Sequence, residues 1–143
     1  MKRFSKILIL LLSFVGIFSL SCNNDDRIPY VQVNLQLPLN LAEFQDLKIP
    51  GNWVYITGGV RGIIVFCANT DEYYAFERNC TYQPYNDSAR IYVDDTNIFA
   101  VCEHCGSKFN LYDGYPVSGE AGLPLTQYAT SLENDILYIY NRY

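Results

Sequence analysis

Two short segments of this 143-residue chain carry groups that could bind a metal ion or form a disulfide. Cys102-Glu-His-Cys-Gly-Ser107 places two thiols and an imidazole within four residues, and Cys80-Thr-Tyr82 lies upstream of it. Thiolate and imidazole are the ligands that zinc and iron prefer in proteins. The chemistry of the chain is therefore expected at these two segments.

The spacing Cys-x-x-Cys-Gly is also the loop type of zinc sites and of rubredoxin-like iron sites. A complete site of that kind needs a second such pair, but the position matching it after Cys80 holds Gln83. Three thiolates together with His104 would still provide four zinc ligands. A thiol–disulfide oxidoreductase needs its first cysteine at the N-terminus of a helix. The Gly-, Asn-, Asp- and Pro-rich residues that follow Cys105 predict no helix.

No independent catalytic site can be recognised in the sequence. His104 is the only histidine, which excludes a triad built on a second one. Cys67 follows the apolar residues 63–66 of an expected strand, and we interpret it as a small buried hydrophobic residue. We find no phosphate-binding glycine loop and identify no small-molecule substrate, so the chain is predicted not to be an enzyme and to carry electrons at most.

The N-terminus predicts export and attachment to lipid. Three basic residues precede the uncharged apolar run 7–20, which is too short to span a bilayer comfortably. This order is typical of a secretory signal peptide. Because Cys22 follows small and apolar residues, as in bacterial lipoproteins, we expect residues 1–21 to be removed and Cys22 to be lipidated. The alternative is an ordinary signal peptide in which Cys22 has no such role.

Residues 22–29 are then expected to form a polar tether and residues 30–143 a single domain. The Asn- and Asp-rich start resembles those of Bacteroidetes envelope lipoproteins, which implies a place in the cell envelope, on the periplasmic or surface side of the outer membrane. The expected partners are the membrane, through the lipid, and an unidentified envelope protein. Loss of the signal peptide changes the net charge from −5 to about −8 and leaves no basic run, which argues against nucleic-acid binding.

Hydrophobic alternation with a period of two dominates the rest of the chain and predicts strands. One helical turn is expected over 41–48, and Asp113-Gly114 is a strong hairpin signal. Short strands with frequent turns predict an all-β sandwich or open barrel. The expected strands are 31–37, 53–57, 63–67, 73–76, 91–93, 98–101, 109–111, 128–132 and 136–140.

Over positions 53–140, the order of strands and cysteine segments resembles a Rieske iron–sulfur domain. That family reads Cys-x-His in its first loop and Cys-x-x-His-Gly-Ser in its second, and the two cysteines hold one iron while the two histidines hold the other. Here the matching positions are Cys80 and Tyr82 in the first loop, and Cys102 and Cys105 in the second. The resemblance implies an antiparallel sandwich or open barrel with two cluster-loop hairpins, in which Ser107 donates a hydrogen bond to cluster sulfur.

Both histidine positions of that ligand set are replaced, so we predict a domain without a cluster or other cofactor that acts in binding or structure. Because the resemblance brings the two loops together, Cys80 is expected to form a disulfide with Cys102, with which it would have shared one iron, or alternatively with Cys105. A disulfide that closes the loop between Cys80 and either partner contributes about 3 kcal/mol to the free energy of unfolding. The alternative is a [2Fe–2S] electron-transfer protein of ferredoxin type, with the three loop cysteines and either His104 or Tyr82 as ligands. Neighbours on an extended loop point to opposite sides, which makes His104 hard to aim at the iron that Cys105 would hold.

Overall fold

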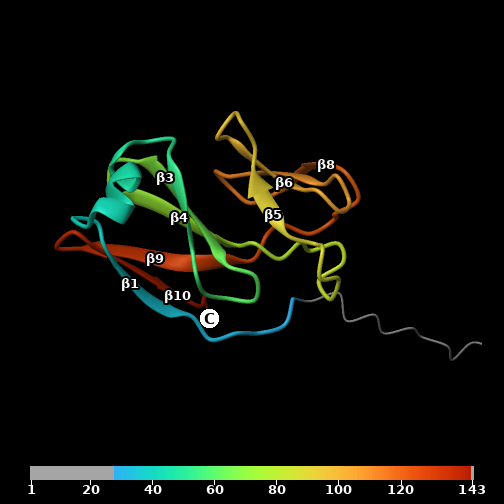
Figure 1. Cartoon of the computed structure of the whole chain (residues 1–143), viewed down its shortest axis with the longest axis horizontal. Helices are drawn as coiled ribbons and strands as arrows, with labels where there is room; N and C mark the ends of the chain where they lie inside the picture. Colours follow the sequence, from blue (N-terminus) through green and yellow to red (C-terminus); the bar gives the residue numbers. More distant parts are fainter. Residues whose placement is uncertain (1–27, 143) are drawn as a thin grey trace, which may run out of the picture.

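The computed structural model describes residues 28–142, which form ten strands and one 3-10 helix (Figure 1). The predicted signal peptide and Cys22 lie outside the described residues. No helix of residues 28–142 is long and apolar enough to cross a membrane. In chain order the elements are β1 (Asn34–Pro38), η1 (Ala42–Lys48), β2 (Trp53–Ile56), β3 (Ile63–Asn69), β4 (Glu72–Glu77), β5 (Ile91–Val93), β6 (Phe99–Cys102), β7 (Lys108–Asn110), β8 (Pro116–Ser118), β9 (Gln127–Glu133) and β10 (Ile136–Tyr140).

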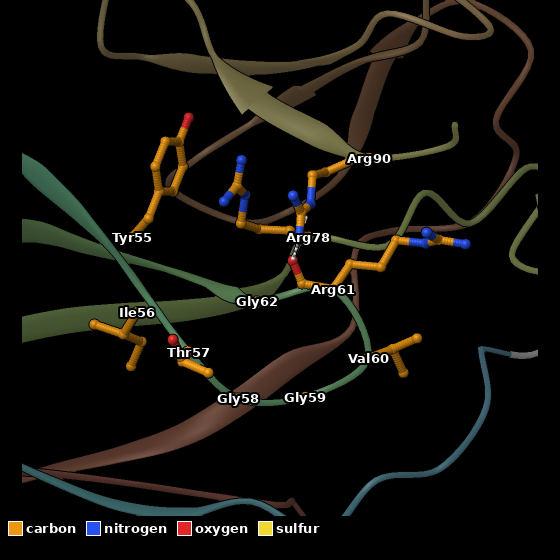
Figure 2. Close-up of a pocket in the computed structure, with 10 residues that line it drawn as sticks. All are labelled: Tyr55, Ile56, Thr57, Gly58, Gly59, Val60, Arg61, Gly62, Arg78 and Arg90. Atoms are coloured by element: carbon orange, nitrogen blue, oxygen red, sulfur yellow. Dashed lines mark hydrogen bonds between the residues drawn. The ribbon is translucent and has the colours of Figure 1, made fainter. Parts of the chain in front are cut away.

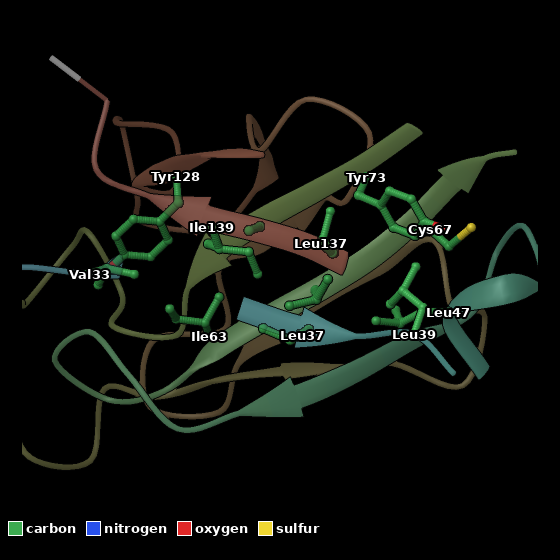
Figure 3. Close-up of a cluster of buried hydrophobic side chains, with 12 residues drawn as sticks. Val33, Leu37, Leu39, Leu47, Ile63, Cys67, Tyr73, Tyr128, Leu137 and Ile139 are labelled. Atoms are coloured by element: carbon green, nitrogen blue, oxygen red, sulfur yellow. The ribbon is translucent and has the colours of Figure 1, made fainter. Parts of the chain in front are cut away.

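The larger sheet has six antiparallel strands in the order β1-β10-β9-β4-β3-β2. Figure 1 shows that the sheet curls, so that β1, β9 and β10 face β3 and β4. Buried side chains from both sides meet inside the curl, where they form the first hydrophobic core together with Leu47 of η1 (Figure 3). The predicted class of an all-β, open-barrel-like fold is confirmed.

β3 is buried on both of its faces because it lies between the two hydrophobic cores. Ile63, Val65 and Cys67 belong to the first core, whereas Ile64 and Phe66 belong to the second. Alternation of side chains along a strand produces this division. The continuous apolar run explains why the sequence identified the strand, and the predicted burial of Cys67 is confirmed at 1% exposure.

The smaller sheet has the order β5-β6-β7-β8 and packs one face against β3 and β4. Phe109 of β7 and Ile91 of β5 are fully buried there together with Phe76 of β4. The predicted hairpin at Asp113-Gly114 joins β7 to β8, and Tyr115 N donates to Asp113 Oδ1 at 2.9 Å. This sheet carries the second of the two cysteine loops.

Two details of the strand prediction were wrong. β8 was not expected, because its residues are a proline followed by two exposed positions and show no hydrophobic alternation. β1 begins at Asn34 rather than at position 31, since its partner strand β10 ends opposite Asn34, at Tyr140. Residues before Asn34 pair with a side chain and not with a strand. Val33 N donates to Asn141 Oδ1, and Asn141 Nδ2 donates to Val31 O.

Candidate thiol site

The two predicted loops meet at the end of the smaller sheet, where three thiols converge. Cys80 follows β4, Cys102 ends β6, and Cys105 lies in the turn after β6. The three Sγ atoms all lie within 4.8 Å of one another, and Sγ of Cys80 is 3.6 Å from Sγ of Cys105. Among residues 28–142, all four cysteines are free thiols, the fourth being Cys67 in the first core.

Backbone hydrogen bonds fix the turn that carries Cys102 and Cys105. Cys102 N donates to Ser107 O at 2.9 Å, and Gly106 N donates to Cys102 O at 2.8 Å. Gly106 has φ +69°, a left-handed conformation that glycine adopts without steric cost. The turn brings both sulfur atoms to the side that faces Cys80.

Ser107 is a buried hydrogen-bond partner of the thiol site. It is fully buried, and its Oγ accepts hydrogen bonds from Cys105 Sγ at 3.1 Å and from Ala121 N at 2.9 Å. The family resemblance implied that this serine donates a hydrogen bond to cluster sulfur, whereas here its Oγ accepts from a thiol. The sulfur atom it meets is that of Cys105, at a position where the family has a histidine.

The three thiols differ in acidity. Burial raises the pKa values of Cys80 and Cys102, both of which are fully enclosed. Burial also acts on Cys105, but in the thiolate form its Sγ would accept hydrogen bonds from the hydroxyl and the backbone N–H of Ser107, and these hold its pKa below the usual value. Since the thiolate is the nucleophile and metal ligand, Cys105 is the thiol of this group most ready to react or ligate.

His104 does not point toward the three thiols. Its exposed ring places Nε2 2.9 Å from Gln83 Oε1 and 2.9 Å from Asn86 Nδ2. Because Gln83 and Asn86 belong to the segment after Cys80, His104 ties the two loops together from the outside. The difficulty in aiming His104 and Cys105 at one metal, expected from the sequence, agrees with this geometry. Tyr82, the other candidate for the fourth ligand, is 39% exposed.

The donor set suits one metal ion better than a Rieske cluster. Tetrahedral coordination with metal–sulfur bonds of about 2.3 Å separates neighbouring sulfur atoms by about 3.8 Å, close to the 3.6 Å between Cys80 and Cys105. A [2Fe–2S] cluster needs four ligands divided between two irons. Three thiols converge here, and the single imidazole is bonded elsewhere. These residues therefore do not fit the Rieske cluster.

Comparison with known proteins identifies the fold. A chain from the complex of reduced oxygenase and oxidized ferredoxin in carbazole 1,9a-dioxygenase aligns with a TM-score of 0.50 and 16% identity, over 80% of this chain and 96% of that chain. The fold is Rieske-like. The Escherichia coli protein NirD aligns with a TM-score of 0.45 and 12% identity, over 76% of this chain and 100% of that chain. No protein-family model matches the chain, and no curated protein matches it.

The Rieske-like fold predicted from the order of strands and loops is thus confirmed, as is the juxtaposition of Cys80 with Cys102 and Cys105. The predicted disulfide, the absence of a cofactor and the lipid anchor stay predictions.

The sequence analysis missed a second polar feature, a pocket lined by Arg61, Arg78 and Arg90. These arginines are separated by at least eleven residues and come from three loop or strand ends, so no local pattern joins them. Only the folded chain brings them together.

Proposed function

We propose that the chain is an envelope lipoprotein whose Rieske-like domain holds no [2Fe–2S] cluster and acts in binding or structure. The observation that carries this proposal is the position of His104. The only imidazole of the chain bonds Gln83 and Asn86 on the outside of the loops. The second iron of a Rieske cluster would therefore have Cys105 and no histidine.

In an exported protein, the buried thiols would be held as a disulfide. Cys102 and Cys105 are both within reach of Cys80, because all three sulfur atoms lie within 4.8 Å of one another. Such a bond would connect the two loops that a shared cluster connects in Rieske proteins. The domain would then present a fixed surface to a partner in the envelope. The lipid on Cys22 would attach it to the membrane.

One observation favours a second candidate, a metal site. The convergence of three thiols, one of them acidified by Ser107, suits a single thiophilic ion such as zinc. The fourth ligand would be a water molecule or Tyr82. An electron-transfer role would instead require iron at the same place.

Purification of the full-length protein from membranes without oxygen tests these candidates against one another. The proposal predicts a colourless protein with less than about 0.1 mol each of iron, zinc and acid-labile sulfide per mol of chain. Stoichiometric zinc would establish the second candidate. Iron with thiolate-to-iron absorption would contradict both the cluster-free proposal and the zinc site, and would make the chain an electron carrier.

A further inference from the structure

An open pocket of about 400 Å³ lies between the β2–β3 loop and the start of β5, apart from the three thiols (Figure 2). Its volume is within the range of small-molecule sites. Three of the six Lys and Arg residues in 28–142 line it, although the chain as a whole is acidic. A local excess of positive charge on an acidic protein needs an explanation.

The central cation of this pocket is Arg78. Its residue exposure is 8%, its guanidinium stacks 3.6 Å from the centre of the Tyr55 ring, and its Nε donates to Ile91 O at 3.0 Å. Tyr92 lies on the guanidinium as well, at 5.0 Å. These contacts fix the plane of the guanidinium, as Figure 2 shows for Arg78 and Tyr55. Neither terminal nitrogen of Arg78 has a hydrogen-bond acceptor within residues 28–142.

The neighbouring Arg90 is held beside Arg78 by the backbone. Its Nε and Nη2 both donate to Arg61 O, at 3.1 and 2.7 Å, and its Nη1 has no acceptor among the described residues. Arg61 contributes this carbonyl but not its charge. Its guanidinium points away from Tyr55 and bonds Asn79, Asn86 and Asp87.

No carboxylate in the described chain forms an ion pair with Arg78 or Arg90. Glu77 is adjacent in sequence, but it is fully buried beneath the loop, where Val60 N, Arg61 N, Asn79 N and Tyr128 Oη donate to its two oxygens. The Arg78 guanidinium is partly desolvated and has no counter-ion among residues 28–142, while its terminal nitrogens still reach the open pocket. Burial accordingly lowers the pKa of the Arg78 guanidinium. An oxyanion in the pocket would supply the missing acceptors.

We propose that this pocket binds a small molecule through a carboxylate or phosphate group. The oxyanion would accept from the terminal nitrogens of Arg78 and from Nη1 of Arg90, since a guanidinium donates to two oxygens of such a group at once. The hydroxyl of Thr57 lines the same pocket and adds a neutral donor. This inference does not depend on the state of the thiols.

The test uses the full-length protein in detergent and follows heat of binding in low-salt buffer. Inorganic phosphate and succinate are the two probes, and neutral succinamide is the ligand control. The proposal predicts saturable binding of at least one anion, no binding of succinamide, and weaker binding as salt rises. The stronger of the two probes identifies the anionic group. A small site of this kind is expected to bind its anion with a dissociation constant of about 10 mM or lower. If neither anion binds at that concentration, the proposal is overturned.

Substitutions locate the site. Arg90→Gln should weaken anion binding about tenfold, because a hydrogen bond to a charged group is lost. Arg78→Lys keeps the charge but loses the planar fork, and should weaken binding by a similar factor or more. Arg142→Gln removes the same charge from an exposed position outside the pocket and should leave binding unchanged. Equal weakening by Arg90→Gln and Arg142→Gln, with no effect of Arg78→Lys, would mean general charge attraction and would contradict the proposal. If Arg78→Lys does not fold, the comparison of Arg90→Gln with Arg142→Gln decides the outcome.

Discussion

His104 and the three loop thiols show how much the position of a few atoms matters for the cofactor. The imidazole lies next to Cys105 in sequence, yet its Nε2 bonds Gln83 and Asn86 while Cys105 Sγ faces Cys80 and Ser107. A ligand set of two cysteines and two histidines therefore cannot form from the residues present. What the geometry offers is three thiols close enough to be linked or to share one ion.

The first prediction concerns the oxidation state of these thiols. In the exported protein, we expect one disulfide between Cys80 and either Cys102 or Cys105, so titration of the unfolded but unreduced protein should find two free thiols among the four cysteines after Cys22. Reduction should lower the free energy of unfolding by about 3 kcal/mol, since the bond closes a loop of more than 20 residues. Peptide mapping identifies the partner. Four free thiols in protein isolated from the envelope would refute the disulfide.

At the scale of elements, the β2–β3 loop depends on the buried carboxylate of Glu77. Val60 N and Arg61 N donate to its two oxygens, and Tyr128 Oη of β9 donates to Oε2 at 2.8 Å. Burial and the hydrogen bond to Glu77 raise the pKa of Tyr128, which keeps its hydroxyl a donor. Glu77 thus joins a loop, the end of β4 and β9 at one buried point, and the arginine pocket lies above it.

This arrangement predicts a specific sensitivity at Gly59. Its φ is +61°, and a Cβ there would collide with Glu77 Oε2 and lie 2.6 Å from Tyr128 Oη. We expect Gly59→Ala to lower the free energy of unfolding by about 2 kcal/mol more than Gly51→Ala, because buried hydrogen bonds to a charged group would be broken. Gly51 has φ +88° and open space around its Cβ position, so it controls for backbone strain alone. Equal losses in chemical denaturation would show that the Glu77 contacts contribute little.

The elements differ in how far the sequence could predict them. The run 63–67 identified β3 because a strand buried on both faces is continuously apolar, and the apolar and aromatic run 136–140 after the turn 133–135 predicted β10 with its observed bounds. β8 gave no signal, since an exposed edge strand starting at Pro116 has neither alternation nor apolar residues to bury. The thiol group was predictable only through the family resemblance. The arginine pocket was not, because it is formed by residues that the fold alone brings together.

At the scale of the whole molecule, two hydrophobic cores hold the sheets together, and the second of them contains Cys80 and Cys102. The first lies inside the curled sheet, and the second joins that sheet to the smaller one through fully buried residues such as Phe76 and Phe109. Burial of each large apolar side chain contributes about 1.5–3 kcal/mol. Since apolar side chains form both cores, we expect the fold to be stable without a bound ion.

Chelation tests that statement. Treatment of the purified protein with EDTA and a thiol-compatible zinc chelator should leave the melting temperature nearly unchanged. The control is the same treatment followed by excess zinc, which should have no effect either. A fall of about 10 °C on chelation, reversed by zinc, would show that a bound ion contributes several kcal/mol to the fold.

Attachment to the membrane is the second prediction at this scale. If Cys22 carries lipid, Cys22→Ala should abolish labelling with a radioactive fatty acid and release the folded domain from membranes. The control is Cys67→Ala in the first core, which removes one cysteine just as Cys22→Ala does. It should leave the lipid label and the membrane-bound fraction unchanged. Wild-type protein recovered in soluble form, unlabelled and cleaved at another residue, would refute the lipoprotein prediction.

We infer that this chain holds no Rieske cluster because two of the four ligands are replaced, and not because of its fold. Anaerobic reconstitution with iron and sulfide tests it most directly, with iron and acid-labile sulfide counted per chain after desalting. The double variant Tyr82→His with Cys105→His restores the family's ligand set and serves as the comparison. We predict about two irons and two sulfides in the double variant and almost none in the natural chain. Two irons and two sulfides in the natural chain would contradict the claim.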